Sequence, residues 1–339
     1  MRKTQMAMAA VALVASSAAM AQVTLYGNAD GSVVTGGGAT VFNGGGGYTT
    51  SLLGVRGSED LGGGLKASFN LESAVNLSSG NRGGGAGGNT NLFNRAANVS
   101  LGNENVGLTL GNQFSIVVGG ALTGATAGAG DNVNIPAVTR VLPIAANVEQ
   151  GAMDGSAVGG GTTGFFIPQA VALRASAGGL TVQAQTRVAT KDASNSSYTA
   201  FALGGGFEGV NFSIGQHTGS GTGTNLNYKA TYIAANTKIG DVGLNGTWAN
   251  NTGDVEGKTY MLGASYSLTE AVSVGGIYAR GVAAVGNQTS LNVKYSLSKS
   301  TVAYVTTSMF SQATGNYGNT NELGVNAKNV TAIGVSHSF

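Results

Sequence analysis

The stretch Ser51–Ser73, SLLGVRGSEDLGGGLKASFNLES, decides the fold class because it holds two short strands joined by a glycine-rich turn. In its second half, apolar residues alternate with polar or charged ones at every position from Leu65 to Glu72. Successive side chains of a strand point to opposite faces, so this segment has one apolar face and one polar face. The apolar face meets a core in a soluble protein and lipid in a membrane barrel, and the rest of the chain distinguishes the two.

The N-terminus has the pattern of a secretory signal peptide. A positive start, Arg2-Lys3, precedes an apolar run that ends at the small-residue cleavage site Ala19–Ala21. We therefore expect residues 1–21 to be a signal peptide used in Sec-type export, and Gln22 to begin the mature domain, 22–339. The apolar run is too short for a membrane-spanning helix.

The composition excludes several classes of protein. Arg2 and Lys3 are two of 17 cations, so the mature chain has as many cations as its 15 acids, and no nucleic-acid partner is indicated. Cysteine is absent, which excludes disulfides and thiolate metal sites, and no cofactor or metal is expected. After the signal no run of 18 apolar residues occurs. A closed barrel is the remaining way to satisfy every backbone group in lipid.

Tight turns recur along the chain, each between segments of alternating polarity. They lie at Ser58–Gly63, Gly102–Asn105, Ala177–Gly179, Phe207–Gly209, Ile239–Asp241, Leu268–Glu270 and Leu297–Lys299. Seven short turns on one side imply eight longer connections on the other and about sixteen strands, a pattern typical of bacterial outer-membrane barrels. We therefore predict an all-β fold, a 16-stranded antiparallel transmembrane β-barrel, which is wide enough for an aqueous lumen.

One interval, Ser115–Ile167, breaks the regular spacing of the turns. It lacks alternation, and long insertions of this kind are often functional. The three prolines, Pro136, Pro143 and Pro168, lie in it or at its edge, so no predicted strand interior contains proline. We expect its apolar middle, residues 134–144, to pack against another part of the molecule.

Three stretches carry a family resemblance: QVTLYGNAD at Gln22–Asp30, LGVRGSEDLGGGLKA at Leu53–Ala67 and GVSHSF at Gly334–Phe339. They resemble the trimeric general porins of Gram-negative bacteria, in the branch typical of Burkholderia and Neisseria relatives. Phe93–Leu101 adds support, and the turn pattern extends the resemblance over the whole mature chain. It implies a homotrimer in the outer membrane, in contact with lipid and lipopolysaccharide, that lets small hydrophilic solutes diffuse passively. It also implies insertion by the barrel assembly machinery, with Phe339 as the assembly signal.

The resemblance assigns a role to residues 115–167. In the family the third loop folds into the lumen and narrows it, and its acids face arginines on the wall. This chain has Leu52 and Asn112 where the family often has cations. The charged residues within the loop are Asp131, Glu149, Asp154 and Arg140. We therefore expect a pore-constricting loop with only weak charge selectivity.

Strand parity places a set of charged residues on the lumenal face. They are Arg56, Lys66, Glu72, Arg174, Arg187 and Lys294, together with Asp30. Charges that line a pore tune which ions pass, although a polar wall is also the default for this architecture. Arg95 falls on the outward face by the same parity. The aromatic residues near strand ends, such as Tyr48, Tyr198, Tyr228, Tyr260 and Trp248, are expected in interfacial girdles.

Other functions find little support. No Ser/His/Asp set can be assembled, so an enzyme is not expected. His217 and His337 lack metal-binding partners, and the glycine-rich segment 36–48 is interpreted as an external loop. A substrate-specific channel would need a lumenal row of aromatic residues or a dense ladder of charges. A secreted adhesive or structural β-protein would need an apolar interior, whereas the inward face here is polar.

Overall fold

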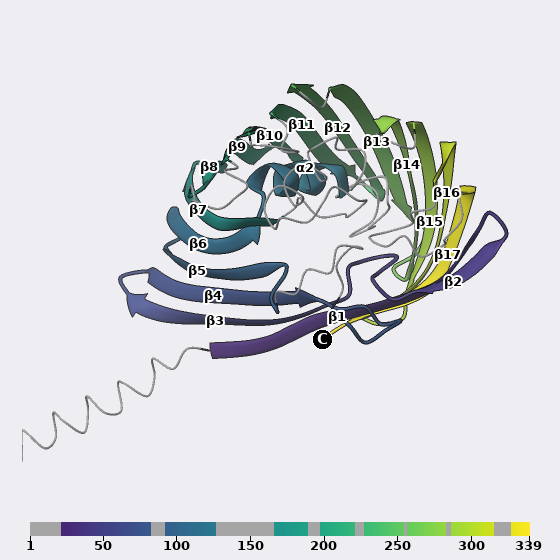
Figure 1. Cartoon of the computed structure of the whole chain (residues 1–339), viewed down its shortest axis with the longest axis horizontal. Helices are drawn as coiled ribbons and strands as arrows, with labels where there is room; N and C mark the ends of the chain where they lie inside the picture. The colour runs from purple at the N-terminus through teal and green to yellow at the C-terminus, as the bar shows by residue number, and fades with distance from the viewer. Residues whose placement is uncertain are drawn as a thin grey trace, which may run out of the picture.

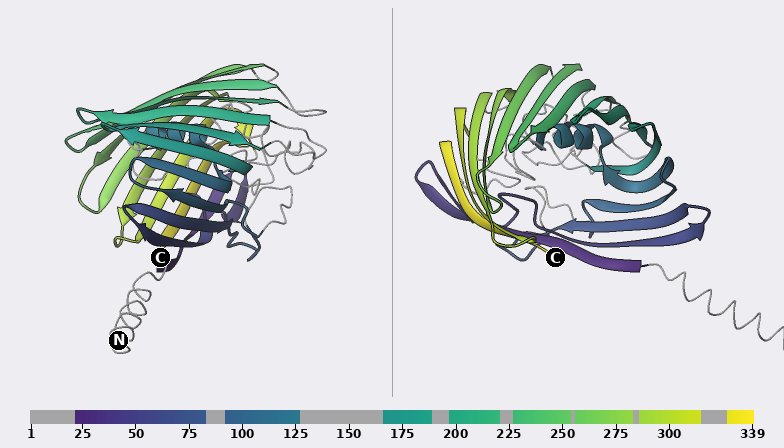
Figure 2. Two further views of the ribbon diagram at one scale, coloured as in Figure 1. Left: turned by 90° about the vertical axis from the view of Figure 1, so that its left-hand side faces the viewer. Right: turned by 180° about the vertical axis from the view of Figure 1, so that it is seen from behind.

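The strands curl into one closed barrel, with the two ends of the sheet joined (Figures 1 and 2). The computed structural model describes residues 22–82, 92–126, 166–188, 197–220, 227–253, 256–282, 286–314 and 327–339. The expected signal peptide, residues 1–21, lies outside the described residues, and strand β1 begins at Gln22. Every neighbouring pair of strands is antiparallel.

The described chain contains seventeen strands and one helix. In order they are β1 (Gln22–Gly36), β2 (Ala39–Asn43), β3 (Leu52–Gly62), β4 (Leu65–Ala74), β5 (Ala96–Gly102), β6 (Val106–Phe114), α2 (Ile116–Thr126), β7 (Phe166–Ala177), β8 (Leu180–Arg187), β9 (Ser197–Phe207), β10 (Val210–Ser220), β11 (Tyr228–Ile239), β12 (Val242–Gly253), β13 (Gly257–Ser267), β14 (Val272–Val282), β15 (Gly286–Ser296), β16 (Thr301–Thr314) and β17 (Ala327–Ser338).

Strands β2 and β3 share one position in the barrel. Both lie on the same edge of β1: β3 pairs with residues 22–28 of β1 and β2 pairs with residues 32–36. The other edge of β1 pairs with β17, and this pairing closes the barrel. The described strands therefore occupy sixteen positions, as the sequence predicts. Residues 36–48 were expected to form an external loop. The structure corrects this expectation, because strand β2 lies within the range.

The ends of the chain meet at the closure. The backbone N–H of Phe339 donates to the carbonyl of Gly27 at 3.1 Å, and that of Gly27 donates back at 3.0 Å. A Cβ atom on Gly27 would overlap the Phe339 ring, so glycine leaves the space in which the terminal aromatic side chain lies. The last strand thus ends directly on the first, as expected from the sequence.

All seven expected short turns are present, with small shifts in their bounds. Strand β3 continues to Gly62, so the first turn is formed by Gly63 and Gly64 instead of residues 58–63. Both glycines have positive φ, +62° and +80°, which other residues rarely adopt. Strand β7 contains Pro168 close to its start, beside an irregularity in its pairing with β6, where a missing N–H is tolerated.

The two faces of the sheet have reversed polarity compared with a soluble protein. Large apolar side chains of the outer face are open: Leu262 is 67% exposed and Ile333 is 62% exposed. Polar side chains of the inner face, such as Gln288 and Ser290, are fully buried. An apolar outer band around a polar interior is the arrangement of a transmembrane barrel. It contradicts the alternative of a secreted β-protein with an apolar core. Among the described residues, no helix is long and apolar enough to cross a membrane.

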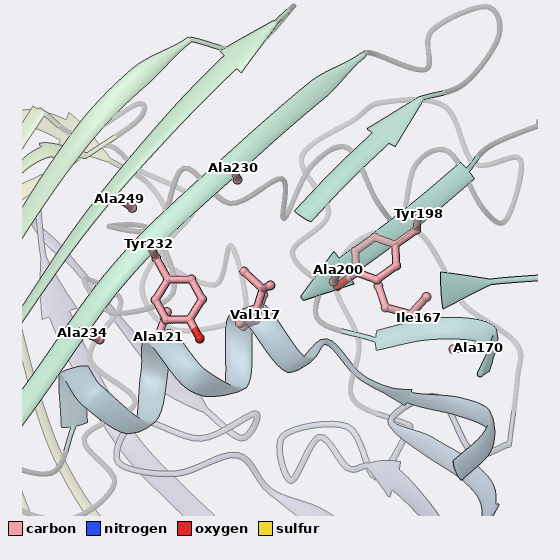
Figure 3. Packing of buried hydrophobic residues seen from close by; sticks show 11 residues of the cluster. Val117, Ala121, Ile167, Ala170, Tyr198, Ala200, Ala230, Tyr232, Ala234 and Ala249 are labelled. Atoms are coloured by element: carbon pink, nitrogen blue, oxygen red, sulfur yellow. The ribbon is translucent and has the colours of Figure 1, made fainter. Parts of the chain in front are cut away.

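Helix α2 lies inside the barrel, against the inner face of β8–β13 (Figures 1 and 3). Val117, Val118 and Ala121 of the helix are fully buried against side chains of the wall. The wall contributes Ile167, Ala170, Tyr198, Ala200, Ala230, Tyr232, Ala234 and Ala249. The sequence did not predict this helix. The small alanine side chains of the wall leave space for it, but alanines also occur in an ordinary strand and therefore gave no sign of a helix packed against them.

Candidate functional site: the inner wall of the barrel

The start of α2 is held by side chains of the wall. Ser115 Oγ lies 2.8 Å from the hydroxyl of Tyr198, and the backbone N–H of Ile116 donates to Gln185 Oε1 at 3.1 Å. Gln185 Nε2 donates in turn to the carbonyl of Phe114 at 3.1 Å. These contacts satisfy polar groups at the point where the chain leaves β6 and turns inward, as buried polar groups require.

A glycine lets the helix approach the wall closely. Gly120 lies directly against the hydroxyl of Tyr232, and a Cβ atom there would overlap this oxygen. The same hydroxyl is hydrogen-bonded to Ser213 Oγ at 2.6 Å, so it cannot move away without losing a partner. Tyr198 and Tyr232 both point toward the helix in Figure 3. Tyr198 was expected in an interfacial girdle, and its buried position under α2 corrects that expectation.

The expected constricting loop is described at its two ends. Residues 116–126 form α2, and Phe166 and Ile167 already belong to β7, so the loop is shorter than 115–167. The four charged residues expected within it, Asp131, Arg140, Glu149 and Asp154, lie outside the described residues.

A continuous polar network lines the inner face of β1, β3 and β4. The guanidinium carbon of Arg56 lies 4.9 Å from the centre of the Tyr26 ring. The hydroxyl of Tyr26 is within 2.8 Å of both Asn70 Oδ1 and Glu72 Oε2. Glu72 also forms an ion pair with Arg95. Strand parity explains why Tyr26, Arg56, Asn70 and Glu72 share the inner face, because residues paired across antiparallel strands point to the same side.

Arg95 corrects one expectation drawn from parity. It was expected to point outward, but it precedes the first residue of β5 and its side chain turns inward to Glu72. Its guanidinium carbon lies 5.0 Å from the centre of the Phe166 ring at the start of β7. Parity applies only to residues within a strand, and Arg95 is not in one. The charge of Glu72 is therefore matched by a cation that sequence analysis had placed on the other face.

The other expected wall cations occupy different environments. Lys66 is exposed beside the first short turn. Arg174 donates to the carbonyls of Asn103 and Glu104 at 2.8 and 3.1 Å, so it braces the turn between β5 and β6. Arg187 is only 6% exposed and lies near Gln169. Lys294 Nζ lies 6.0 Å from the centre of the Tyr48 ring.

Asp30 faces inward, as its parity predicts, but it is enclosed by protein donors. Residues 44–51, between β2 and β3, fold over it. This brings Tyr48 into a buried cluster with Tyr304, where the ring centres are 5.4 Å apart, instead of the expected girdle. The sequence signal for this arrangement is the run Gly44–Gly47, which had been interpreted as part of an external loop. Among the described residues, no group of three His, Asp or Glu side chains is placed to hold a metal ion.

Tyr260 and Trp248, both expected in the girdles, lie on the outer face, and their place at a membrane interface stays a prediction. Tyr260 is exposed on the outer face and pairs across strands with Trp248. His337, also on that face, has its Nδ1 atom 2.8 Å from Thr301 Oγ1. His217, in contrast, is fully buried on the inner side, edge-on to the Tyr198 ring at a centroid distance of 5.6 Å. The position of Tyr228 in its expected girdle stays a prediction.

Comparison with known proteins places this architecture in a family. The Gram-negative porin family profile matches residues 7–335. The outer membrane porin protein 32 of Delftia acidovorans is 44% identical over 108 residues, which span 30% of this chain and 28% of that relative's length. The anion-selective porin of Comamonas acidovorans is similar in structure, with a TM-score of 0.71 and 21% identity over 94% of this chain and 100% of that chain.

A second solved structure agrees in fold. The trimer form of OmpT from Vibrio cholerae has a TM-score of 0.67 and 15% identity, covering 94% of this chain and 99% of that chain. At these identities the solved structures support the fold, while the profile match covers nearly the whole sequence. The chain therefore belongs to the Gram-negative porin family of outer-membrane β-barrels.

Proposed function

We propose that this protein forms a water-filled channel across the outer membrane, through which small hydrophilic solutes and ions diffuse passively. The observation that carries the proposal is the polar inner face within a closed barrel of sixteen strand positions whose outer face is apolar. Sixteen strands enclose more space than side chains alone fill. The family and the fold indicate a channel protein rather than an enzyme.

The channel works as a homotrimer in contact with outer-membrane lipid and lipopolysaccharide, after insertion by the barrel assembly machinery. The support is the family membership, together with a solved neighbour described in a trimer form. The Phe339 ring, beside the closure of β1 and β17, is the assembly signal. We also propose that the third loop, expected at 115–167, narrows the lumen; the support is α2, which follows Ser115 and packs on the inner wall. The permeability of such a channel depends on its radius and on the polarity and charge of its lining.

The wall charges favour a weak preference for anions. Two of the three inward acids of the described strands have close partners: Glu72 forms the ion pair with Arg95, and Asp30 accepts from four donors. The third, Asp60, pairs across strands with the cationic residue Lys66. Arg56, in contrast, is exposed on the inner face. The porin of Comamonas acidovorans is described as anion-selective, so the preference proposed for this chain is for ions of the same sign.

The substitution Arg56→Ala tests this selectivity. A unit charge about 8 Å from a passing ion in water contributes about 0.5 kcal/mol before screening. At 0.1 M salt the Debye length is about 10 Å, so we expect the anion-to-cation permeability ratio to fall about twofold. The zero-current potential across a planar bilayer, measured in a salt gradient, reports the ratio. Arg187→Ala should have a smaller effect, because Arg187 is mostly buried.

Arg280→Ala is the matched control. Arg280 pairs with Tyr260 on the outer face, so its removal should leave the potential unchanged. A wild-type channel with strong cation preference would refute the assignment of the sign. An equal shift in the Arg56 and Arg280 variants would show that Arg56 does not act from the lumen. Absence of ion-conducting pores in the wild-type protein would refute the channel itself.

A further inference from the structure

We propose that residues 44–51, between β2 and β3, form a second inward-folded segment that narrows the channel opposite α2, and that Asp30 holds it on the wall. We call residues 44–51 the inner segment. The proposal rests on the channel function and adds to it a further element that determines the width of the lumen.

The side chain of Asp30 receives four hydrogen bonds, three of them from the inner segment. Oδ1 accepts from the backbone N–H of Gly47 at 2.9 Å and from the hydroxyl of Tyr304 at 2.6 Å. Oδ2 accepts from the backbone N–H groups of Tyr48 and Thr49 at 3.1 and 2.8 Å. Hydrogen bonds to an ionised carboxylate are about twice as strong as those between neutral groups. One wall residue therefore holds three consecutive backbone groups of the segment.

Further contacts fix both ends of the inner segment. At its end, Ser51 Oγ bonds to both the backbone N–H and the carbonyl of Asp30, each at 2.9 Å. At its start, the carbonyl of Gly44 accepts from the N–H of Leu77 at 2.9 Å. Within it, the N–H of Ser51 donates to Gly45 at 3.2 Å. These contacts describe an ordered structure with satisfied backbone groups, which an external flexible loop would not have.

The inner segment lies on the lumenal side of the wall. Val33 is 51% exposed on the outer face of β1. Because side chains alternate between the faces of a strand, Ser32 and Asp30 point inward. A Cβ atom on Gly47 would lie 2.7 Å from Ser32 Oγ and 2.5 Å from the Tyr304 hydroxyl. Gly46 has φ of +113°, which other residues rarely adopt. The glycines thus let the backbone lie flat against the inner face.

The position of the inner segment is opposite that of α2. It is held by β1 and by Tyr304 of β16, whereas α2 packs against β10 and β11 among other strands. With β2 and β3 sharing one position, β10 is eight positions from β1 in either direction around the barrel. Two inward-folded elements on opposite walls restrict a lumen more than either one alone. The inner segment adds a layer of chain about 5 Å thick, less than the roughly 10 Å between stacked sheets because its glycines bring the backbone close to the wall.

The test is to release the inner segment with Asp30→Ala and to record single-channel conductance in molar salt, where charge effects are screened. We expect the conductance of the assembled pore to rise about 1.5-fold, the order expected when a layer about 5 Å thick leaves the lumen. Asp60→Ala is the matched control: Asp60 is also a carboxylate on the inward parity of its barrel wall, and it accepts from the backbone N–H of Gly62, the last residue of β3, instead of from the segment. Its conductance should stay at the wild-type value.

A disulfide provides the reciprocal test. The chain has no cysteine, and a Cβ on Gly47 lies 3.4 Å from that of Ser32, close to the range of about 3.5–4.5 Å for disulfides. Ser32→Cys and Gly47→Cys, with Tyr304→Phe to make space, are added to Asp30→Ala. The oxidised pore should have wild-type conductance, and reduction should raise it to the level of Asp30→Ala.

The outcomes separate this proposal from the channel function. Unchanged conductance in Asp30→Ala pores, or a raised conductance that oxidation does not reverse, would overturn the role of the segment while leaving the channel intact. If Asp30→Ala does not assemble, Tyr304→Phe and Asp30→Asn take its place. Each weakens the same set of hydrogen bonds and should raise the conductance or its open-state fluctuations. Wild-type behaviour of both would overturn the proposal.

Discussion

Phe69→Arg is the sharpest test of which face of the barrel meets lipid. Phe69 lies in the middle of β4, and its ring lies so close to Gly57 of β3 that a Cβ there would overlap it. On the other side it pairs with Val99 of β5, which is 53% exposed on the outer face. An arginine at this position therefore points into the apolar band that surrounds the barrel.

The expected loss of folding stability depends on how deep residue 69 lies in the bilayer. Arginine on the lipid face costs about 2–4 kcal/mol at the bilayer midplane and much less near the interfaces. Because each 1.4 kcal/mol is a factor of ten, the equilibrium between folded and unfolded protein should shift by roughly 30-fold to 700-fold. Loss of the Phe69 ring adds little, since lipid replaces its apolar surroundings. Reversible urea unfolding of the barrel in phospholipid vesicles, followed by tryptophan fluorescence of Trp248, measures the change.

Ser68→Arg is the matched control, because Ser68 is the preceding residue and pairs with Ser58 and Ser100 on the inner face. Its side chain would reach water in the lumen, so we expect a change of less than about 1 kcal/mol, within the range of ordinary surface substitutions. Equal destabilisation by the two variants, or a larger effect of Ser68→Arg, would refute the assignment of faces throughout β3, β4 and β5.

Two further predictions concern the helix and the C-terminus. Gly120→Val should destabilise the barrel by about 1–3 kcal/mol, because the new side chain would overlap the Tyr232 hydroxyl, as in other overpacked sites. Gly119→Ala is the control, because its Cβ would meet only the Phe114 ring at 3.3 Å. Thermal unfolding measures both variants, and an equal loss of stability in the two would contradict the close contact of Gly120. Deletion of Phe339 should reduce the amount of trimer in the outer membrane without blocking export, since its ring lies at the closure of β1 and β17. Equal amounts of wild-type and truncated trimer in outer-membrane fractions would show that this aromatic residue is not needed for assembly.

The alternation in residues 51–73 predicts the barrel because a strand has a side-chain period of two and lipid requires every backbone group to be paired. The same local rule places Arg56, Lys66, Glu72 and Asn70 on the inner face. These inferences succeed because they depend only on neighbours along the chain. The number of strand positions follows in the same way, from counting short turns.

The partners of those side chains depend on contacts across the barrel, which the sequence does not specify. Parity placed Arg95 on the wrong face. This residue lies just outside β5, so the direction of its side chain is set by the ion pair with Glu72 and not by the strand. Tyr198 and Tyr48 were expected at the membrane interface, yet Tyr198 packs against α2 inside the barrel and Tyr48 lies in the inner segment against Tyr304. Local patterns contain no information on where such segments fold.

The sequence by itself determined that the chain is a β-barrel with a polar interior and an apolar exterior, since that follows from alternation and turn spacing alone. Only the tertiary structure decided what lies inside the barrel. Helix α2 and the inner segment each depend on glycines that fit against one particular wall tyrosine, Gly120 against Tyr232 and Gly47 against Tyr304. The members of these pairs are more than 100 residues apart in the chain, and a close approach over that separation is set by the closure of the whole sheet.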